Sequence, residues 1–410
     1  MSTLRLTHTT RCPNGNCVIT GSKSESNRLL ILQALYPELA LENLSNSDDT
    51  QAMIRGLLSE DSTVDIGHAG TTMRFLTSYF ATTPGVEKLL TGSKRMQERP
   101  IKLLVEALRS LGASIQYDKE EGYPPLRILG KKITSSEVTL AANISSQYIT
   151  SLMLVAPKLA SGLTIQLVGE ITSIPYINMT CSLLQRAGIN AVFEGQTIQV
   201  SPQVYIAPKT LAVESDWSSA SYHFSLVALG KNAAISIKNY TSDSLQGDRV
   251  LVDIYKQLGV KATFEENTLH LEKSNDVKPH IELDLIKAPD IAQTIAVSCF
   301  GLGISCDLTG LHTLKIKETD RLLALKNELG KLGASIRVTD KSLHLEARKV
   351  DIVENVAIDT YHDHRMAMAF APLGLCVPIE INDADVVSKS YPTFWEDLQT
   401  LGFTVSTINN

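Results

Sequence analysis

Apolar and polar positions alternate along this chain in blocks that predict short strands followed by buried helices. Near the start, residues 16–20 (Asn-Cys-Val-Ile-Thr) are strand-like, and residues 21–28 (Gly-Ser-Lys-Ser-Glu-Ser-Asn-Arg) lead into the apolar run 29–32. Glycine and serine favour a turn, serine and asparagine favour a helix start, and the apolar run favours the helix itself. The pattern therefore predicts a strand, a polar turn and a helix N-terminus in this segment.

A second pattern repeats at intervals of about seventy residues, which indicates a repeated structural unit. In each copy an apolar helical stretch ends at a glycine and enters a short strand, as expected of a helix C-cap. The caps are Gly112, Gly188, Gly259, Gly333 and Gly402, and a degenerate first copy lies at residues 53–58. Each unit reads as strand, helix, strand, helix, strand, strand. Six units predict an α/β protein with two domains of three units each.

The length of the chain also indicates two domains, because 410 residues exceed what one hydrophobic core usually serves. No low-complexity linker separates the halves, and the best internal boundary lies near residues 213–217. We expect one domain at residues 1–19 plus 215–410 and the other at residues 20–214. The chain would then pass between the two domains twice, near residues 20 and 214.

Composition narrows the class of protein. Hydrophobic residues make up 43% and charged residues 20%, which is typical of a globular protein. The net charge of −6 argues against a nucleic-acid or anionic-membrane surface, which would need a basic face. Six cysteines without a C-x-x-C pair favour reduced thiols, and there is no apolar signal core or long apolar run. We therefore expect a cytoplasmic protein without a membrane span.

Polar clusters like the one at residues 21–28 recur at the start of later helical stretches. Helix N-termini attract anions, while lysine, arginine and serine add charges and hydrogen-bond donors. One such cluster is equally compatible with an ordinary capped helix. Seven in one chain predict a convergent site for small molecules with several negative charges. The further six lie at residues 70–74, 95–100, 145–148, 317–321, 362–365 and 389–392.

Together these motifs resemble the 3-phosphoshikimate 1-carboxyvinyltransferase (EPSP synthase) family, in the family's order from Gly21 to Phe394. The resemblance implies a two-domain inside-out α/β barrel. Each domain would hold three βαβαββ repeats about a pseudo-threefold axis, and the active site would lie in the cleft between the domains. It implies transfer of the enolpyruvyl group of phosphoenolpyruvate to the 5-hydroxyl of shikimate 3-phosphate, with release of phosphate, in aromatic amino-acid biosynthesis. It implies no metal and no cofactor, and we expect a monomer whose partners are these two small molecules.

The resemblance also implies the substrate-binding residues. Both substrates carry a carboxylate and a phosphate, whose mutual repulsion requires fixed cations. Shikimate 3-phosphate would be held by Lys23, Ser24, Arg28, Ser145, Ser146, Gln147, Ser173, Tyr176, Asp290 and Lys317. Phosphoenolpyruvate would be held by Lys23, Gly70, Arg99, Gln147, Arg321, Arg365 and Lys389, with Arg74 nearby.

Three residues are candidates for acid/base catalysis. By resemblance, Asp290 is the base candidate at the substrate hydroxyl, Lys317 would assist it, and Glu318 would handle the proton at C3 of phosphoenolpyruvate. Which group moves which proton stays open. Asp290 could instead cap the helix that follows it, and Lys317 with Glu318 could be a solvated helix start.

Some features depart from the family pattern or suggest other functions. The family often has Asn at the positions of His68 and Thr313, and His362 with His364 could suggest a metal, although no third ligand cluster is visible. A UDP-N-acetylglucosamine enolpyruvyl transferase is the nearest alternative. Against it, Ser24 follows Lys23 and the loop at residues 91–95 has no cysteine. A non-catalytic anion-binding protein on the same scaffold is the other alternative. It would be expected to lose Asp290, Lys317 or Glu318, and all three are present.

Overall fold

The computed structural model describes residues 2–142, 145–171 and 174–408, and it divides the chain into two compact units. Unit 1 comprises Met1–Thr20 and Glu214–Asn410, and unit 2 comprises Gly21–Val213. The N-terminal segment belongs to unit 1, where the Ser215 hydroxyl donates to the carbonyl of Ile19 at 2.5 Å.

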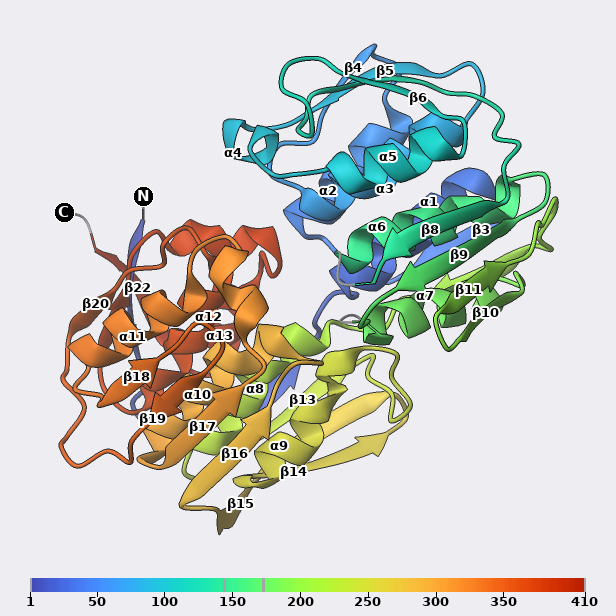
Figure 1. Ribbon diagram of the computed structural model, residues 1–410. Coiled ribbons are helices and arrows are strands. Elements are labelled where there is room, and N and C mark those ends of the chain that lie inside the picture. The colour runs from blue at the N-terminus through green and yellow to red at the C-terminus, as the bar shows by residue number, and fades with distance from the viewer. Residues whose placement is uncertain (1, 143–144, 172–173, 409–410) are drawn as a thin grey trace. The chain divides into compact units, whose positions relative to one another are not determined.

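Unit 2 contains two complete βαβαββ repeats and one shorter repeat (Figure 1). In each complete repeat the first two strands are parallel and the last two join them antiparallel. The first repeat is β4 (Thr63–Asp65), α3 (Gly70–Thr82), β5 (Glu87–Thr91), α4 (Lys94–Gln97), α5 (Lys102–Ser110), β6 (Ser114–Tyr117) and β7 (Leu126–Leu129). The second is β8 (Glu137–Ala141), α6 (Ser146–Val155), η1 (Ala156–Lys158), β9 (Leu163–Val168), α7 (Ile174–Arg186), β10 (Ala191–Glu194) and β11 (Thr197–Val200). The shorter repeat is α1 (Lys23–Leu35), β3 (Leu39–Glu42), α2 (Asp48–Leu58) and β12 (Lys209–Ala212), in which β12 and β3 form a two-stranded parallel sheet.

Unit 1 contains three four-stranded sheets with the same order of elements. The first repeat is β2 (Asn14–Cys17), α8 (Trp217–Leu229), β13 (Ala234–Lys238), η2 (Gly247–Val250), α9 (Leu251–Lys256), β14 (Leu258–Glu265) and β15 (Thr268–Val277). The second is β16 (His280–Asp284), η3 (Pro289–Ile291), α10 (Ala292–Leu302), β17 (Ser305–Thr309), η4 (His312–Ile316), α11 (Arg321–Lys331), β18 (Ile336–Val338) and β19 (Leu343–Leu345). The third is β20 (Val356–Ile358), α12 (His364–Phe370), η5 (Ala371–Leu375), β21 (Ile379–Ile381), η6 (Ala384–Lys389), α13 (Phe394–Thr400) and β22 (Thr404–Ile408), completed by β1 (Thr3–Thr7).

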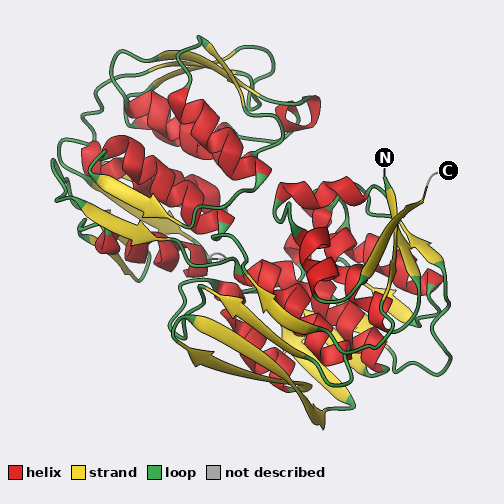
Figure 2. Ribbon diagram, turned by 180° about the vertical axis from the view of Figure 1, so that it is seen from behind, coloured by secondary structure: helices red, strands yellow, loops and turns green. Residues whose placement is uncertain are grey.

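Within each unit the helices lie inside and the sheets lie outside, as Figure 2 shows. Three helices of unit 1 (α8, α10 and α12) and three of unit 2 (α1, α3 and α6) are buried on almost every side. Helices that pack on all sides belong in a core. Their small polar residues bond to each other, as where Ser298 Oγ donates to Ser225 Oγ at 2.8 Å, so the buried hydroxyls are satisfied.

The predicted fold class is confirmed, and the glycine caps explain why the repeat was visible in the sequence. All five predicted cap glycines have positive φ, between 79° and 105°, the region that favours glycine. Four of them follow a helix end as predicted, but Gly259 lies inside β14, at a register shift between Leu258 and Val260, so it is not the cap of α9. The degenerate first copy is not a cap, because Gly56 lies inside α2. A Cβ there would lie 2.5 Å from Leu76 Cδ1, so this glycine permits close packing of α2 on α3. The strand predicted at residues 16–20 lies earlier, at Asn14–Cys17.

Throughout the ranges that the structure describes, each helix is too short or too polar to cross a membrane.

Candidate active site

A cluster of charges in unit 1 is built around Arg321, the first residue of α11. Its Nε donates to Asp363 Oδ2 at 2.6 Å, Nη1 to Asp290 Oδ1 at 3.0 Å and Nη2 to Glu318 Oε2 at 2.7 Å. Only 2% of the Arg321 side chain is exposed. Burial opposes the charge, but the three carboxylates raise the pKa of Arg321 above its ordinary value. Arg321 is therefore a fixed cation.

Asp290 forms ion pairs with three cationic side chains. Besides Arg321, Lys317 Nζ lies 3.5 Å from its Oδ1 and Arg365 Nη2 lies 3.3 Å from its Oδ2. Asp290 lies in η3, while the N-cap residue of α10 is Ile291. Asp290 is therefore not the N-cap residue of that helix.

Arg365, the second residue of α12, joins the N-termini of three inner helices. Asp363 caps α12 by accepting from Arg365 N at 2.9 Å, and Arg365 Nη1 donates to the carbonyl of Asp290 at 3.1 Å. Its Nη2 donates to the hydroxyl of Ser218, on α8, at 3.4 Å. The first turns of α8, α10 and α12 therefore lie together, where their dipoles favour an anion.

Asp248 adds a fourth carboxylate to this cluster. It accepts a short hydrogen bond from the Ser218 hydroxyl. Burial, with a contribution from the Asp290 charge, raises the pKa of Asp248 to about 6. We call Asp248, Asp290, Lys317, Glu318, Arg321, Asp363 and Arg365 the carboxylate–arginine cluster.

Lys389 lies beside the same part of α12 but outside the cluster. Its Nζ donates to the carbonyl of His362 at 2.6 Å, and the His362 ring contacts Asp383 Oδ2 at 2.7 Å. His364 is buried, which lowers its pKa to about 3. The two histidines have different surroundings, and within the described ranges no three His, Cys, Asp or Glu side chains are grouped to hold a metal ion.

In unit 2, Arg28 is locked into the core by helices α1, α6 and α7. Its guanidinium donates to the carbonyl of Ser24 at 2.7 Å and to the hydroxyls of Thr150 at 3.3 Å and Thr180 at 2.9 Å. The Tyr176 ring lies 5.8 Å from the guanidinium carbon. Burial lowers the pKa of Arg28 to about 10, which still leaves it cationic at neutral pH.

The start of α3 brings a second predicted group together. A Cβ on Gly70 would lie 2.6 Å from Arg99 Nη1, so the exposed Arg99 guanidinium lies against this glycine. Arg74 supports both, because its Nη1 donates to the carbonyl of Gly70 at 3.1 Å and its Nη2 to the carbonyl of Pro100 at 3.1 Å.

The start of α6 presents the third predicted group. Ser145 caps the helix by accepting from Gln147 N at 3.4 Å, and Gln147 Nε2 donates to Thr71 Oγ1, on α3, at 3.2 Å. Lys23 is half-buried at the start of α1 and makes no hydrogen bond or ion pair with the described residues. Ser173, also predicted to bind shikimate 3-phosphate, lies outside the described residues.

The structure therefore groups most of the predicted residues within each unit, although Lys389 lies outside the carboxylate–arginine cluster. It also adds residues that the sequence did not single out. Asp363 has a sequence signal as an aspartate at a helix start. Asp248, Thr150 and Thr180 have none, because their partners are remote in the sequence. Thr313 Oγ1 is buried without a hydrogen-bond partner among the described residues.

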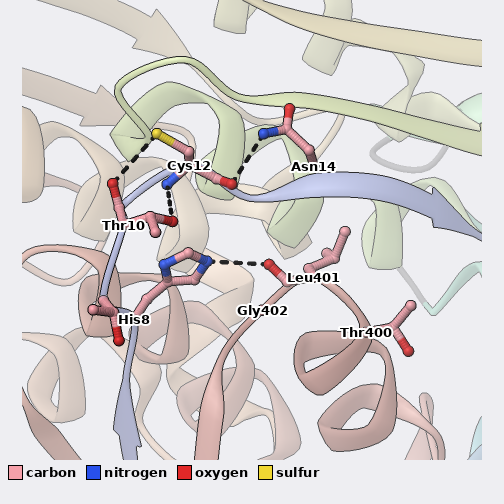
Figure 3. Close-up of a pocket in the computed structure, with 8 residues that line it drawn as sticks. His8, Thr10, Cys12, Asn14, Thr400, Leu401 and Gly402 are labelled. Atoms are coloured by element: carbon pink, nitrogen blue, oxygen red, sulfur yellow. Dashed lines mark hydrogen bonds between the residues drawn. The ribbon is translucent and has the colours of Figure 1, made fainter.

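One hollow of about 380 Å³ lies elsewhere in unit 1, between the segment after β1 and the turn after α13 (Figure 3). None of the predicted site residues lines it. Its polar groups bond to one another: Cys12 Sγ donates to the carbonyl of Thr10, and a His8 ring nitrogen lies 3.1 Å from the carbonyl of Leu401. We assign no substrate to this hollow.

Comparison with known proteins identifies the family. The family model for EPSP synthase (3-phosphoshikimate 1-carboxyvinyltransferase) matches residues 56–398. The chain belongs to the EPSP synthase family. Proteins named 3-phosphoshikimate 1-carboxyvinyltransferase are 46% identical in Bacteroides fragilis, covering 94% of both chains, and 35% identical in Histophilus somni, covering 95% of this chain and 96% of that one. A third, from Marinomonas sp. strain MWYL1, is 36% identical over 95% of this chain and 97% of that one.

The solved EPSP synthase of Acinetobacter baumannii shares the fold, with a TM-score of 0.84, 20% identity and complete coverage of both chains. The resemblance seen in the motifs is thus confirmed. As a member of the EPSP synthase family, the chain is an enolpyruvyl transferase of aromatic amino-acid biosynthesis.

Proposed function

We propose that this chain transfers the enolpyruvyl group of phosphoenolpyruvate to the 5-hydroxyl of shikimate 3-phosphate, and that the residues grouped in each unit share this work. Family membership supports the reaction. The observation that supports the residue roles is the carboxylate–arginine cluster. It combines fixed cations for an anionic substrate with carboxylates that can exchange protons.

Asp290 and Lys317 would act together on the substrate hydroxyl. Lys317 Nζ lies 3.5 Å from Asp290 Oδ1, so one hydroxyl oxygen could contact both groups. Asp290 would accept the proton while the ammonium of Lys317 holds the oxygen. Arg321 and Arg365 orient Asp290 from its other side.

Glu318 would handle the proton at C3 of phosphoenolpyruvate. Of the carboxylates around Arg321 it has the most exposed side chain, at 37%, against 17% for Asp290 and 0% for Asp363. It can therefore move toward a substrate without dismantling the core. The other two carboxylates would keep Arg321 in place.

Arg321 and Arg365 would also bind the phosphoenolpyruvate carboxylate. A guanidinium has five N–H donors, and the four hydrogen bonds of Arg321 to carboxylates leave one N–H, on Nη1, for a substrate. The adjoining helix N-termini favour the same negative charge. Lys389, beside α12, would bind the phosphate.

In unit 2 the three groups of residues would divide the anionic groups between them. Ser145, Ser146 and Ser173 would donate to the phosphate of shikimate 3-phosphate at the start of α6. Lys23, Ser24, Arg28 and Tyr176 would complete that site. Gly70 and Arg99 would hold phosphoenolpyruvate, with Gln147 contacting both substrates.

Phosphate release from the two substrates tests the proposed function directly. The purified chain should release phosphate only when shikimate 3-phosphate and phosphoenolpyruvate are both supplied, and mass spectrometry should detect the enolpyruvyl product. Absence of this product at high enzyme concentration would contradict the proposal. UDP-N-acetylglucosamine in place of shikimate 3-phosphate should give no turnover.

A further inference from the structure

A tyrosine hydroxyl connects two groups of residues that the proposed function assigns to different substrates. Tyr148 is the third residue of α6, directly after Gln147, and is only 7% exposed. Its hydroxyl donates to the carbonyl of Pro100 at 2.6 Å. Pro100 follows Arg99 in the chain, so the bond runs from the start of α6 to the segment that carries Arg99.

The same carbonyl is held from a second direction. Arg74 Nη2 donates to it at 3.1 Å, while Arg74 Nη1 donates to the carbonyl of Gly70 at 3.1 Å and lies 3.6 Å from Met96 Sδ. Arg74 therefore joins both sides of the contact in which Arg99 lies against Gly70. Tyr148 extends this network from α3 to α6.

The Arg99 guanidinium lies against Gly70 but makes no hydrogen bond or ion pair with the described residues. Its position therefore depends on the backbone that carries it. Arg99 N donates to the carbonyl of Met96 at 3.1 Å, and the carbonyl of Pro100 is fixed by Tyr148 and Arg74. Loss of the Tyr148 bond would release one of the two donors that fix this turn.

We infer that Tyr148 is a positioning residue whose hydroxyl fixes Arg99 against Gly70. Through this bond, binding of the phosphate group of shikimate 3-phosphate at the start of α6 affects the phosphoenolpyruvate site at the start of α3. Tyr148 touches neither substrate in this scheme. Gln147 provides a second link in parallel, through Thr71. The inference rests on the proposed function and adds a residue and a linkage to it.

The test is the variant Tyr148→Phe, which removes one oxygen and keeps the ring. A neutral hydrogen bond lost at one site corresponds to about a two- to tenfold change in an equilibrium. We expect the KM for phosphoenolpyruvate to rise by about this factor, while kcat and the Kd for shikimate 3-phosphate change by less than about twofold. The tightening of phosphoenolpyruvate binding by saturating shikimate 3-phosphate should shrink by a similar factor.

The matched control is Tyr117→Phe. The Tyr117 hydroxyl, also in unit 2, is buried without a hydrogen-bond partner among the described residues, so its removal should leave both substrates unaffected. A double-mutant cycle then shows whether Tyr148 acts through Arg99. In an Arg99→Ala background, Tyr148→Phe should produce no further change in phosphoenolpyruvate binding.

Three results would overturn the inference while leaving the proposed function intact: unchanged phosphoenolpyruvate kinetics in Tyr148→Phe, equal weakening of both substrates, or full persistence of the effect without Arg99. Arg74→Lys provides a second probe of the same carbonyl if Tyr148→Phe proves unstable. It should also raise the KM for phosphoenolpyruvate selectively, and an equal effect on both substrates would again refute the linkage. An inactive wild-type chain would instead refute the proposed function.

Discussion

Replacing Glu318 by glutamine should separate proton handling from structure. Glutamine keeps the shape of the side chain and an oxygen that can accept from Arg321 Nη2, which lies 2.7 Å from Glu318 now. Arg321 also keeps its bonds to Asp290 and Asp363. The Glu318 side chain is 37% exposed, so solvent screens the lost ion pair and stability should change by about 1 kcal/mol or less.

The rate should respond far more strongly than the stability. Loss of one general acid/base group costs about a hundred- to ten-thousand-fold in rate, which equals about 2.7–5.4 kcal/mol of activation free energy. Binding of phosphoenolpyruvate should not weaken, because the change removes a negative charge next to an anion site. The expected Glu318→Gln enzyme is therefore folded, binds substrates and turns over very slowly.

Phosphate release at saturating substrates measures kcat, isothermal calorimetry measures binding, and thermal unfolding measures stability. Glu346→Gln is the matched control, since Glu346 forms an exposed pair with Lys349 at the same i, i+3 spacing. It should leave kcat unchanged. The reasoning fails if Glu318→Gln keeps kcat within about threefold of the wild type, or if its loss of rate is matched by loss of folding.

Three further substitutions test other parts of the structure, two in the candidate site and one at His223, a buried residue of α8. Gly70→Ala places a Cβ 2.6 Å from Arg99 Nη1, so the guanidinium must move and the KM for phosphoenolpyruvate should rise about ten- to a hundredfold while shikimate 3-phosphate binding is spared. Asp363→Asn should lower the free energy of unfolding by about 2–3 kcal/mol in urea titrations, because buried Arg321 loses its closest carboxylate. For His223, burial lowers the pKa to about 4, so the unfolded chain binds the extra proton first as pH falls. The free energy of unfolding therefore falls as the pH drops from about 6.5 to 4. Between pH 7 and pH 5 this fall should be about 2 kcal/mol smaller in the His223→Gln variant than in the wild type.

Each of these has an outcome that would count against it. Equal effects of Gly70→Ala on both substrates would mean that Arg99 is not the group displaced. An Asp363→Asn protein as stable as the wild type would show that the remaining carboxylates compensate fully. An unaltered pH dependence in His223→Gln, compared with the exposed control His280→Gln, would show that His223 does not contribute to acid unfolding.

The repeat architecture was accessible from the sequence because its signals are local. A helix that ends at Gly333 or Gly402 is encoded within a few residues, and the spacing of such glycines reveals the repeat. The shorter first repeat was not accessible. Its sheet pairs β3 with β12, which lie near opposite ends of the unit 2 sequence, and no local pattern specifies that pairing.

The candidate site shows the same difference between local signals, which the sequence reveals, and long-range contacts, which it does not. The motif containing Lys317, Glu318 and Arg321 was recognisable because its residues are adjacent in the chain. The bond from Arg321 to Asp363 spans 42 residues and that from Arg28 to Thr180 spans 152, so neither partner could be chosen from sequence spacing. Mid-helix threonines have many possible roles, and only packing of α1 on α7 selects this one.

The carboxylate–arginine cluster has four carboxylates and only three cationic side chains, which bears on how a charged substrate is admitted. The carboxylate of an incoming substrate would add a further negative charge to this cluster, in which carboxylates already outnumber cations. Asp248, whose pKa is about 6, is well placed to respond, because a nearby anion raises that pKa further toward neutrality. Association of phosphoenolpyruvate should then draw protons from the solution near pH 7. The heat of binding should depend on the ionisation enthalpy of the buffer, and the affinity should decline as the medium becomes more alkaline.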